Sequence, residues 1–157
     1  MLRAGEKKAL EPEVASSLEA RIGWLVRNGR PEALAAVRSL AAGPAEGHRE
    51  AALHLYKLGV KVDKKLARSM LTHEDWRVQA LAGAFLMKHG DEDTIDYVIR
   101  GLNDEVATEE AQVIFDALGK SKLPAAKAAI TKFLPKATDV RAFRMLALFH
   151  HLSLIHI

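Results

Sequence analysis

Residues 90–102 read GDEDTIDYVIRGL, and this stretch decides the fold. After the glycine, large aliphatic residues follow at Ile95, Val98, Ile99 and Leu102, which is the spacing of one face of an α-helix. The end of the stretch, a basic residue followed two places later by a large apolar one, recurs along the chain. The apolar members are Leu40, Met70, Leu102 and Leu134, at intervals of 30, 32 and 32 residues. A fixed period of this length predicts a repeat protein.

A second series of residues runs out of phase with the first. It consists of Gly29, Gly59, Gly90 and Gly119, at intervals of 30, 31 and 29 residues, and each glycine closes an apolar helical pattern. Two interleaved series with one period indicate two helices per repeat. We expect nine helices, over 12–30, 31–42, 47–58, 62–71, 75–89, 92–102, 106–119, 123–134 and 139–152. No segment has the alternating pattern of a strand.

Residues 90–104 resemble the outer helix and following turn of HEAT-type repeats, and Asp139-Val140-Arg141 is similar to the start of the family's inner helix. The resemblance covers about residues 29–152, although the Val-Arg pair is missing at Gly47-His48. It implies an all-α fold, a right-handed α-solenoid of about four helix-pair (HEAT-like) repeats. HEAT signatures record packing, so no activity follows from the resemblance.

Three segments make up the expected domain organisation: a flexible N-terminal segment at 1–11, the α-solenoid at 12–152 and a tail at 153–157. The C-terminal stretch of the chain is apolar up to Ile157. A solenoid needs a polar cap at its end, which this stretch does not provide, so we interpret the chain as a fragment of a longer repeat protein. The sequence LSLIHI at 152–157 resembles translated read-through of a sequencing adapter. The alternative is a native apolar tail that docks on the last helix.

The amino-acid composition excludes several classes of protein and of functional site. Hydrophobic residues make up 49% of the chain and charged residues 27%, as in an ordinary globular domain. The chain has no cysteine, which excludes disulfide scaffolds, thiolate catalysis and zinc sites built on cysteine. No stretch has the 18 or so apolar residues of a membrane span, and no signal peptide is recognisable. We therefore expect a cytoplasmic protein that does not associate with membranes.

Charge is distributed in bands. Residues 91–116 carry one basic and nine acidic residues, a net charge of −8, whereas residues 117–144 carry seven basic residues and one acidic, a net charge of +6. A nucleic-acid groove needs a continuous basic track, which the acidic band would interrupt. The bands favour a protein or peptide partner. Alternatively, the charges only complement helix ends.

Catalytic and metal sites are not indicated. Asp91, Asp93 and Asp96 lack the glycine and the final glutamate of a calcium loop. Glu50 and His54 are one helical turn apart, but two ligands on one helix do not make a metal site. We therefore predict no catalytic residue, no metal, no cofactor and no enzymatic activity.

The function we expect is that of a protein–protein interaction scaffold that binds its partner on the concave face. The alternative is a nucleic-acid-binding HEAT-like module similar to the HEAT-like DNA glycosylases, which hold a damaged nucleotide with aromatic and acidic side chains. Asp75-Trp76-Arg77 offers such a trio, with Trp24 as a second tryptophan. Helix packing is the more ordinary role of both tryptophans.

The expected binding residues lie before the glycines that mark equivalent helix ends. Six places before Gly59, Gly90 and Gly119 are Leu53, Ala84 and Val113, an apolar row. The next row holds Lys57 and Lys88, flanked by Tyr56, Met87 and Arg49. An apolar strip with basic flanks suits an acidic amphipathic peptide. A phase error of one residue would instead put Leu53 and Val113 in the core.

Overall fold

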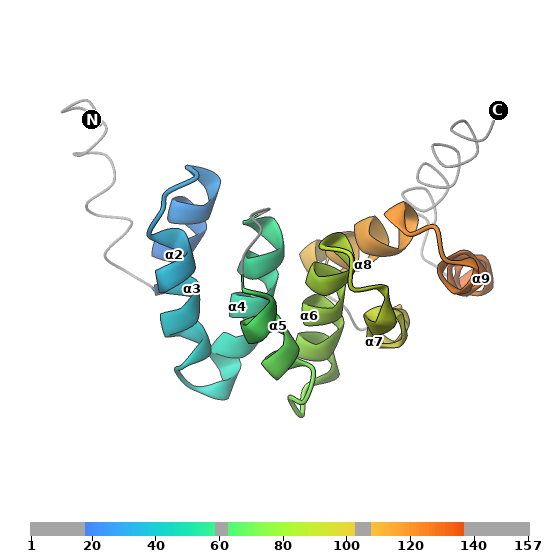
Figure 1. Cartoon of the computed structure of the whole chain (residues 1–157), viewed down its shortest axis with the longest axis horizontal. Coiled ribbons are helices and arrows are strands. Elements are labelled where there is room, and N and C mark those ends of the chain that lie inside the picture. Colours follow the sequence, from blue (N-terminus) through green and yellow to red (C-terminus); the bar gives the residue numbers. More distant parts are fainter. Residues whose placement is uncertain (1–17, 59–62, 103–107, 137–157) are drawn as a thin grey trace. The chain divides into compact units, whose positions relative to one another are not determined.

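The structure is a computed structural model that describes residues 18–58, 63–102 and 108–136 (Figure 1). These residues form eight α-helices and two short 3-10 helices, and no strand is found among them. The α-helices are α2 (Leu18–Arg27), α3 (Ala33–Ala41), α4 (Ala45–Lys57), α5 (Lys64–Met70), α6 (Trp76–Lys88), α7 (Ile95–Arg100), α8 (Thr108–Lys120) and α9 (Pro124–Phe133). The 3-10 helices are η1 (Glu92–Thr94) and η2 (Leu134–Lys136). The expectation of an all-α protein is confirmed.

Eight of the nine expected helices coincide with observed ones, with ends that differ by a few residues. The start of the first helix, expected at residue 12, lies outside the described residues, which begin at Leu18. Four expected features lie outside the described residues: the helix at 139–152, the segment at 1–11, the tail at 153–157 and Gly59.

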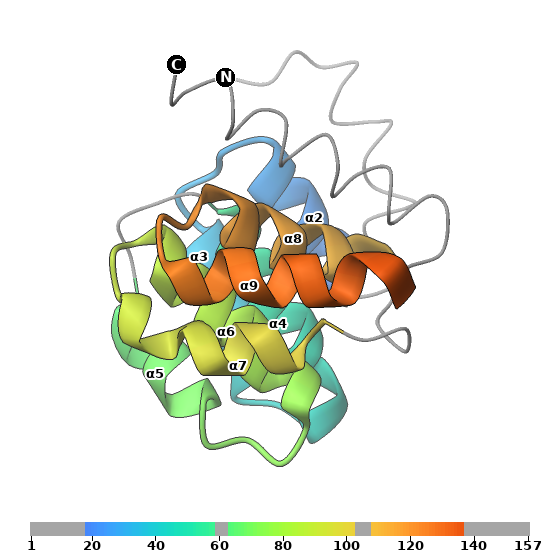
Figure 2. The ribbon, with the colours of Figure 1, turned by 90° about the vertical axis from the view of Figure 1, so that its right-hand side faces the viewer.

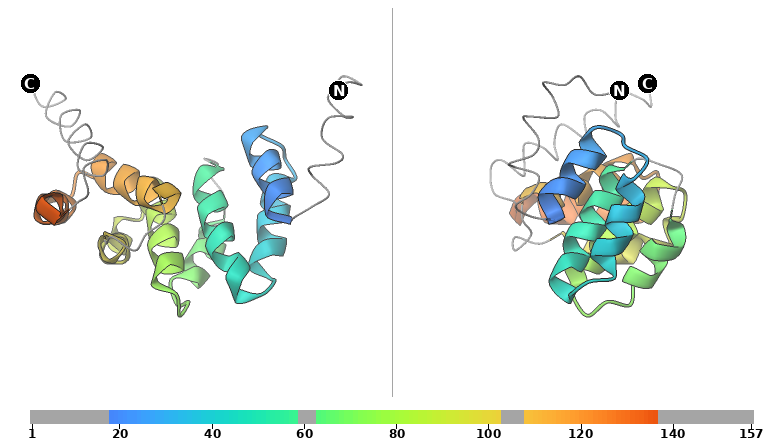
Figure 3. Two further views of the ribbon diagram at one scale, coloured as in Figure 1. Left: turned by 180° about the vertical axis from the view of Figure 1, so that it is seen from behind. Right: turned by 90° about the vertical axis from the view of Figure 1, so that its left-hand side faces the viewer.

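The chain divides into two compact units, residues 1–60 and 61–157. In the first unit, α3 packs against both α2 and α4, and α2 also contacts α4 (Figure 3). Their contacts bury Ile22, Val37 and Leu40. At Gly47, an added Cβ would lie 3.0 Å from Leu40 Cδ1 and 3.2 Å from the Leu40 carbonyl, so the glycine lets α4 start close to α3.

In the second unit, helices contact the next helix along the chain and also the one after it. Helix α6 packs against α5, α7 and α8, while α9 packs against α7 and α8 (Figure 2). Within this unit, α6 and α8 therefore form one layer, and α7 and α9 form another. In this ladder of alternate contacts, α6, α7 and α8 each pack against at least three other helices.

Helix α6 is apolar around nearly its whole circumference. All eight residues from Ala80 to Met87 are buried, which is expected of a central helix. Gly83 lies where an added Cβ would meet Val98 Cγ2 at 3.1 Å and Tyr97 Cβ at 3.2 Å, so its lack of a side chain allows α7 to pack closely.

The turns after α2 and α6 have the same backbone geometry. Gly29 has a φ of 59° and Gly90 a φ of 91°, both in the region that favours glycine. After each, the next residue donates its N–H five residues back, from Arg30 to Leu25 at 2.9 Å and from Asp91 to Leu86 at 2.9 Å. This pattern is the Schellman motif.

Gly119 does not play the expected role. It lies inside α8, which continues to Lys120, and it is buried. The helix ends instead at Ser121, whose N–H bonds to the Leu118 carbonyl at 3.2 Å and whose hydroxyl accepts from the Leu123 N–H at 3.2 Å. A serine that bonds the following backbone can stop a helix without a left-handed residue.

Candidate interaction surface

The expected apolar strip is not exposed. Leu53 is 4% exposed, Val113 is 5% exposed and Ala84 is fully buried, so the prediction that these residues line an open surface is wrong. The phase of the helices explains the difference, because α4 and α8 turn these positions into the core. Their aliphatic side chains contribute to stability in the usual way of buried residues.

The other residues of the expected site differ in their exposure. Tyr56 and Met87 are buried, Arg49 is half-buried, and Lys57 and Lys88 are exposed. These five positions come from α4 and α6, which belong to the two separate units. A role in partner binding stays a prediction for Arg49, Lys57 and Lys88, the members that reach solvent.

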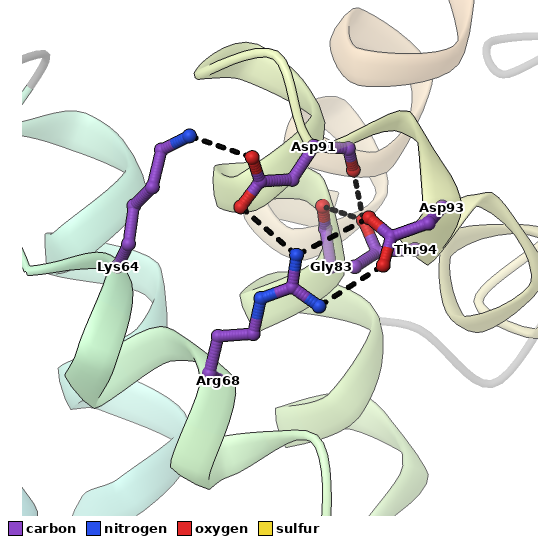
Figure 4. A network of polar contacts seen from close by, with 6 residues as sticks. All are labelled: Lys64, Arg68, Gly83, Asp91, Asp93 and Thr94. Atoms are coloured by element: carbon purple, nitrogen blue, oxygen red, sulfur yellow. Dashed lines mark hydrogen bonds and ion pairs between the residues drawn. The ribbon is translucent and has the colours of Figure 1, made fainter.

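Ion pairs join α5 to the turn that follows α6 (Figure 4). Lys64 Nζ lies 2.6 Å from Asp91 Oδ1, and Arg68 donates through NH2 to Asp91 Oδ2 at 3.1 Å. Arg68 also donates to both carboxylate oxygens of Asp93, at 3.0 and 3.3 Å. Helix spacing produces this arrangement, since Lys64 and Arg68 are four residues apart and therefore share a face of α5.

The electrostatics of this network favour the ionised forms of Asp91 and Arg68. The hydrogen bond from Lys64, followed by that from Arg68, lowers the pKa of Asp91 below its ordinary value. Hydrogen bonds to Asp93 and then to Asp91 raise the pKa of Arg68 further. The carboxylates of Asp91 and Asp93 thus neutralise two basic side chains of α5, Lys64 and Arg68.

A buried hydroxyl continues the same connection inward. Thr94 Oγ1 lies 2.9 Å from the Asp91 carbonyl and 3.1 Å from the Gly83 carbonyl (Figure 4). A hydroxyl has one proton, so it donates to one of these oxygens at a time. Thr94 is 1% exposed, and its hydroxyl fastens the start of α7 to the middle of α6.

The residues considered for nucleotide binding, Asp75, Trp76 and Arg77, interact with one another at the start of α6. Asp75 is the N-cap of α6 and accepts from the Arg77 N–H at 2.9 Å. The Arg77 guanidinium lies 5.2 Å from the centre of the Trp76 ring, a cation–π distance. Asp75 and the face of Trp76 therefore each have a partner already.

Metal ligands do not cluster in the described part of the chain: no group of three or more His, Asp or Glu side chains there could hold an ion. Glu50 and His54 do approach each other, with 3.7 Å between Oε2 and Nε2. His54 is 7% exposed, so it is buried.

In and next to α9, all charged side chains are basic. Every lysine between residues 117 and 136 is exposed, and this stretch has no acidic residue. We call these five side chains the α9 lysine surface; they are Lys120, Lys122, Lys127, Lys132 and Lys136. They come from the end of α8, the loop before α9, α9 itself and η2.

The helix pattern of α9 explains why its lysines point to solvent. Ala126, Ile130 and Phe133 are buried at spacings of four and three residues, so one stripe faces the rest of the unit. Phe133 packs against Phe115 of α8, with 6.2 Å between ring centres. Lys127 and Lys132 lie off this stripe.

Sequence reasoning located the basic band but did not select α9 as its exposed face. The signal was available, because residues 117–136 combine five lysines with a clear apolar stripe. It also missed the ion pairs of Asp91 and Asp93, which in the sequence are only part of the acidic band at 91–116. Nothing local relates these residues to Lys64 and Arg68, which are 23 to 27 positions away.

Comparison with known proteins adds no family: no family model matches the chain, and no curated protein matches it. Among the described residues, no helix is long and apolar enough to cross a membrane.

Proposed function

We propose that the chain is a module of a right-handed, HEAT-type α-solenoid that binds a protein or peptide and catalyses no reaction. The observation that carries the proposal is the ladder of contacts in the second unit, where α6 packs on α8 and α7 packs on α9. Stacked helix pairs of this kind are the building principle of solenoids, whose repeats contact only their neighbours. Such stacks expose extended surfaces, and their usual ligands are macromolecules.

The proposed binding mode differs from the one expected from sequence. Because Leu53, Ala84 and Val113 are buried, an apolar strip cannot supply the affinity. Exposed charge supplies it instead, and the partner is selected by electrostatic complementarity, which favours specificity and fast association. We place this module in the cytoplasm and assign it no cofactor.

The alternative of a glycosylase-like nucleic-acid module has less support. It needs a carboxylate and an aromatic face that are open to a nucleotide, whereas Asp75 caps α6 and Arg77 covers Trp76. Among the described residues, the feature in its favour is the α9 lysine surface.

One experiment separates the two functions. The full chain is immobilised and incubated with a nuclease-treated lysate at physiological salt, and each retained protein is then produced separately and titrated by calorimetry. We expect a partner that binds one-to-one at micromolar or lower concentration without nucleic acid. Capture that depends on added nucleic acid, or release of a modified base from duplex DNA, would contradict the proposal.

A further inference from the structure

Two groups of basic side chains in the second unit differ in their pairing. Lys64 and Arg68 of α5 are neutralised by Asp91 and Asp93. In the α9 lysine surface, only Lys120 has an acidic neighbour, Asp116 at 2.8 Å.

Within the described part of the chain, the side chains of the remaining four make no ion pair or hydrogen bond; they are Lys122, Lys127, Lys132 and Lys136. The positive charge of these lysines is therefore not compensated by side chains of the described residues. A ligand that brings negative charge would compensate it, since several like charges near one another raise the local potential.

The exposed side chains of α9 other than its lysines are small. Ala125 and Ala128 are exposed, and α9 is ten residues long, about 15 Å at the rise of an α-helix. Small side chains let another backbone come close, while the flexible lysines reach around it. The surface can thus accept a segment of polypeptide along its length.

We propose that the α9 lysine surface binds an acidic polypeptide segment, rich in aspartate and glutamate, as the partner chemistry of the proposed function on which this inference rests. Carboxylates spaced along such a segment would pair with Lys122, Lys127, Lys132 and Lys136. Lysine suits this role because its ammonium group is a compact charge that does not require the planar geometry of a bidentate ligand.

Two other polyanions fit the surface less well. Residues 101–136 have no arginine, and both aromatic residues there, Phe115 and Phe133, are buried, so the arginine and stacking contacts common in nucleic-acid sites are missing. An anionic membrane would be held by charge alone, because the exposed apolar residues of α9 are only proline and alanine, which insert weakly.

The test measures binding of the full chain to a fluorescein-labelled poly-L-glutamate of 20 residues by fluorescence anisotropy at 0.1 M salt. The variant Lys127→Glu with Lys132→Glu reverses two charges of the surface. We expect it to weaken binding about tenfold, and Lys127→Gln with Lys132→Gln to weaken it about threefold, since charge removal perturbs less than reversal.

A matched control changes the net charge equally elsewhere. Arg21 of α2 and Lys65 of α5 are both exposed, and their double change to glutamate should weaken binding less than twofold. Circular dichroism must show that all variants fold as the wild type does. Equal loss in the control and in the α9 variant would overturn the proposal, because binding would then depend only on net charge.

Three further outcomes would overturn it: tighter binding of a 20-base-pair duplex than of poly-L-glutamate, tighter binding of vesicles that contain phosphatidylserine, or self-association of the chain that the α9 variant abolishes. The two proposals fail in different ways. A captured protein that binds the α9 variant with unchanged affinity contradicts this inference alone. If no protein is captured from the lysate while poly-L-glutamate binding still depends on the α9 lysines, the proposed function alone is contradicted.

Discussion

The turns after α2 and α6 have one backbone geometry and two different uses. After α2, Gly29 is followed by Arg30, whose guanidinium lies 5.4 Å from the ring of Trp24 on the same helix. After α6, Gly90 is followed by Asp91, which pairs with Lys64 and Arg68 of another helix. The glycine therefore determines that the chain turns, while the residue after it determines whether the turn is fastened to its own helix or to a neighbouring one.

The two regions should differ most in the effect of substituting the glycine inside the helix before each turn, which is Gly23 in α2 and Gly83 in α6. An added Cβ at Gly83 would meet the Val98 methyl at 3.1 Å and the Thr94 carbonyl at 3.3 Å. We expect Gly83→Ala to lower the free energy of unfolding by about 1–2 kcal/mol, because overpacking outweighs the gain in helix propensity. Urea denaturation followed by circular dichroism measures the change.

Gly23 of α2 is the matched control. There the nearest atom is Arg27 NH1 at 3.3 Å, the end of a flexible side chain that can move away. Gly23→Ala should therefore raise the free energy of unfolding by up to about 1 kcal/mol. A stabilising Gly83→Ala would show that α7 can shift to make room, and the close approach of α6 and α7 would then not depend on glycine.

The second prediction concerns the turns themselves. Gly29→Ala and Gly90→Ala each force a side chain into a left-handed conformation, although neither Cβ would meet an atom within 4 Å. Each should cost about 1–2 kcal/mol in the free energy of unfolding, since the strain is local. Thermal unfolding of both variants tests this equality. A clearly larger loss at Gly90 would mean that the ion pairs of Asp91 depend on the glycine.

The third prediction removes the tertiary link and keeps the turn. Asp91→Asn should lower the free energy of unfolding by up to about 1 kcal/mol at low salt, and less at 1 M salt, because the pairs are partly exposed. The pKa of Asp91 is lower in the folded protein than its ordinary value of 3.8. The stabilisation by the ionised carboxylate is therefore fully present above pH 3.8 and is lost as the pH falls through the lower, folded-state pKa.

Exposed Asp96, on α7, is the control for this change. Asp96→Asn should alter stability by less than about 0.5 kcal/mol, as for an ordinary surface position. Equal effects of the two substitutions, or a loss at Asp91 that persists in 1 M salt, would contradict an electrostatic link.

The smallest effect should come from the residue before each glycine, which is Asn28 in one turn and His89 in the other. His89 packs on Phe85 with 4.5 Å between ring centres, and burial, followed by the charges of Lys88 and Lys64, lowers its pKa. The neutral ring is thus favoured in the folded state. Its stabilisation is complete above the ordinary pKa of 6.5 and declines as the pH falls from there to the folded value.

His89→Asn makes the second turn resemble the first and should remove this decline. The measurement is the midpoint of thermal unfolding of both proteins between pH 8 and pH 5, with the difference attributed to His89. Parallel curves for wild type and variant would exclude a contribution from the histidine.

Local patterns were sufficient to locate most helices but not all of their ends. The buried residues of α9 recur at helical spacing, and Pro124 begins the helix one residue after its expected start at 123. Gly119 misled the prediction, because a glycine in a helix and a glycine after a helix look the same in sequence. The distinction depends on whether Ser121 provides the stop, which is a property of the folded loop.

The candidate site was less predictable than the helices. A shift of one residue in a helix moves a side chain by about 100° around its axis, so the choice between core and surface at Leu53 and Val113 rested on a phase that helix ends do not define. Charge was easier to read, since an excess of lysine over 117–136 is visible without a structure.

By itself, the sequence determined that the chain is helical, where most of its helices lie and which stretch is basic, because periodicity and charge are local properties. Tertiary structure alone decided which residues are buried, that Asp91 and Asp93 join Lys64 and Arg68, and that four lysines around α9 have no acidic partner among the described residues. These features depend on which helices pack together, and the free energy of that packing comes from contacts between residues distant in sequence.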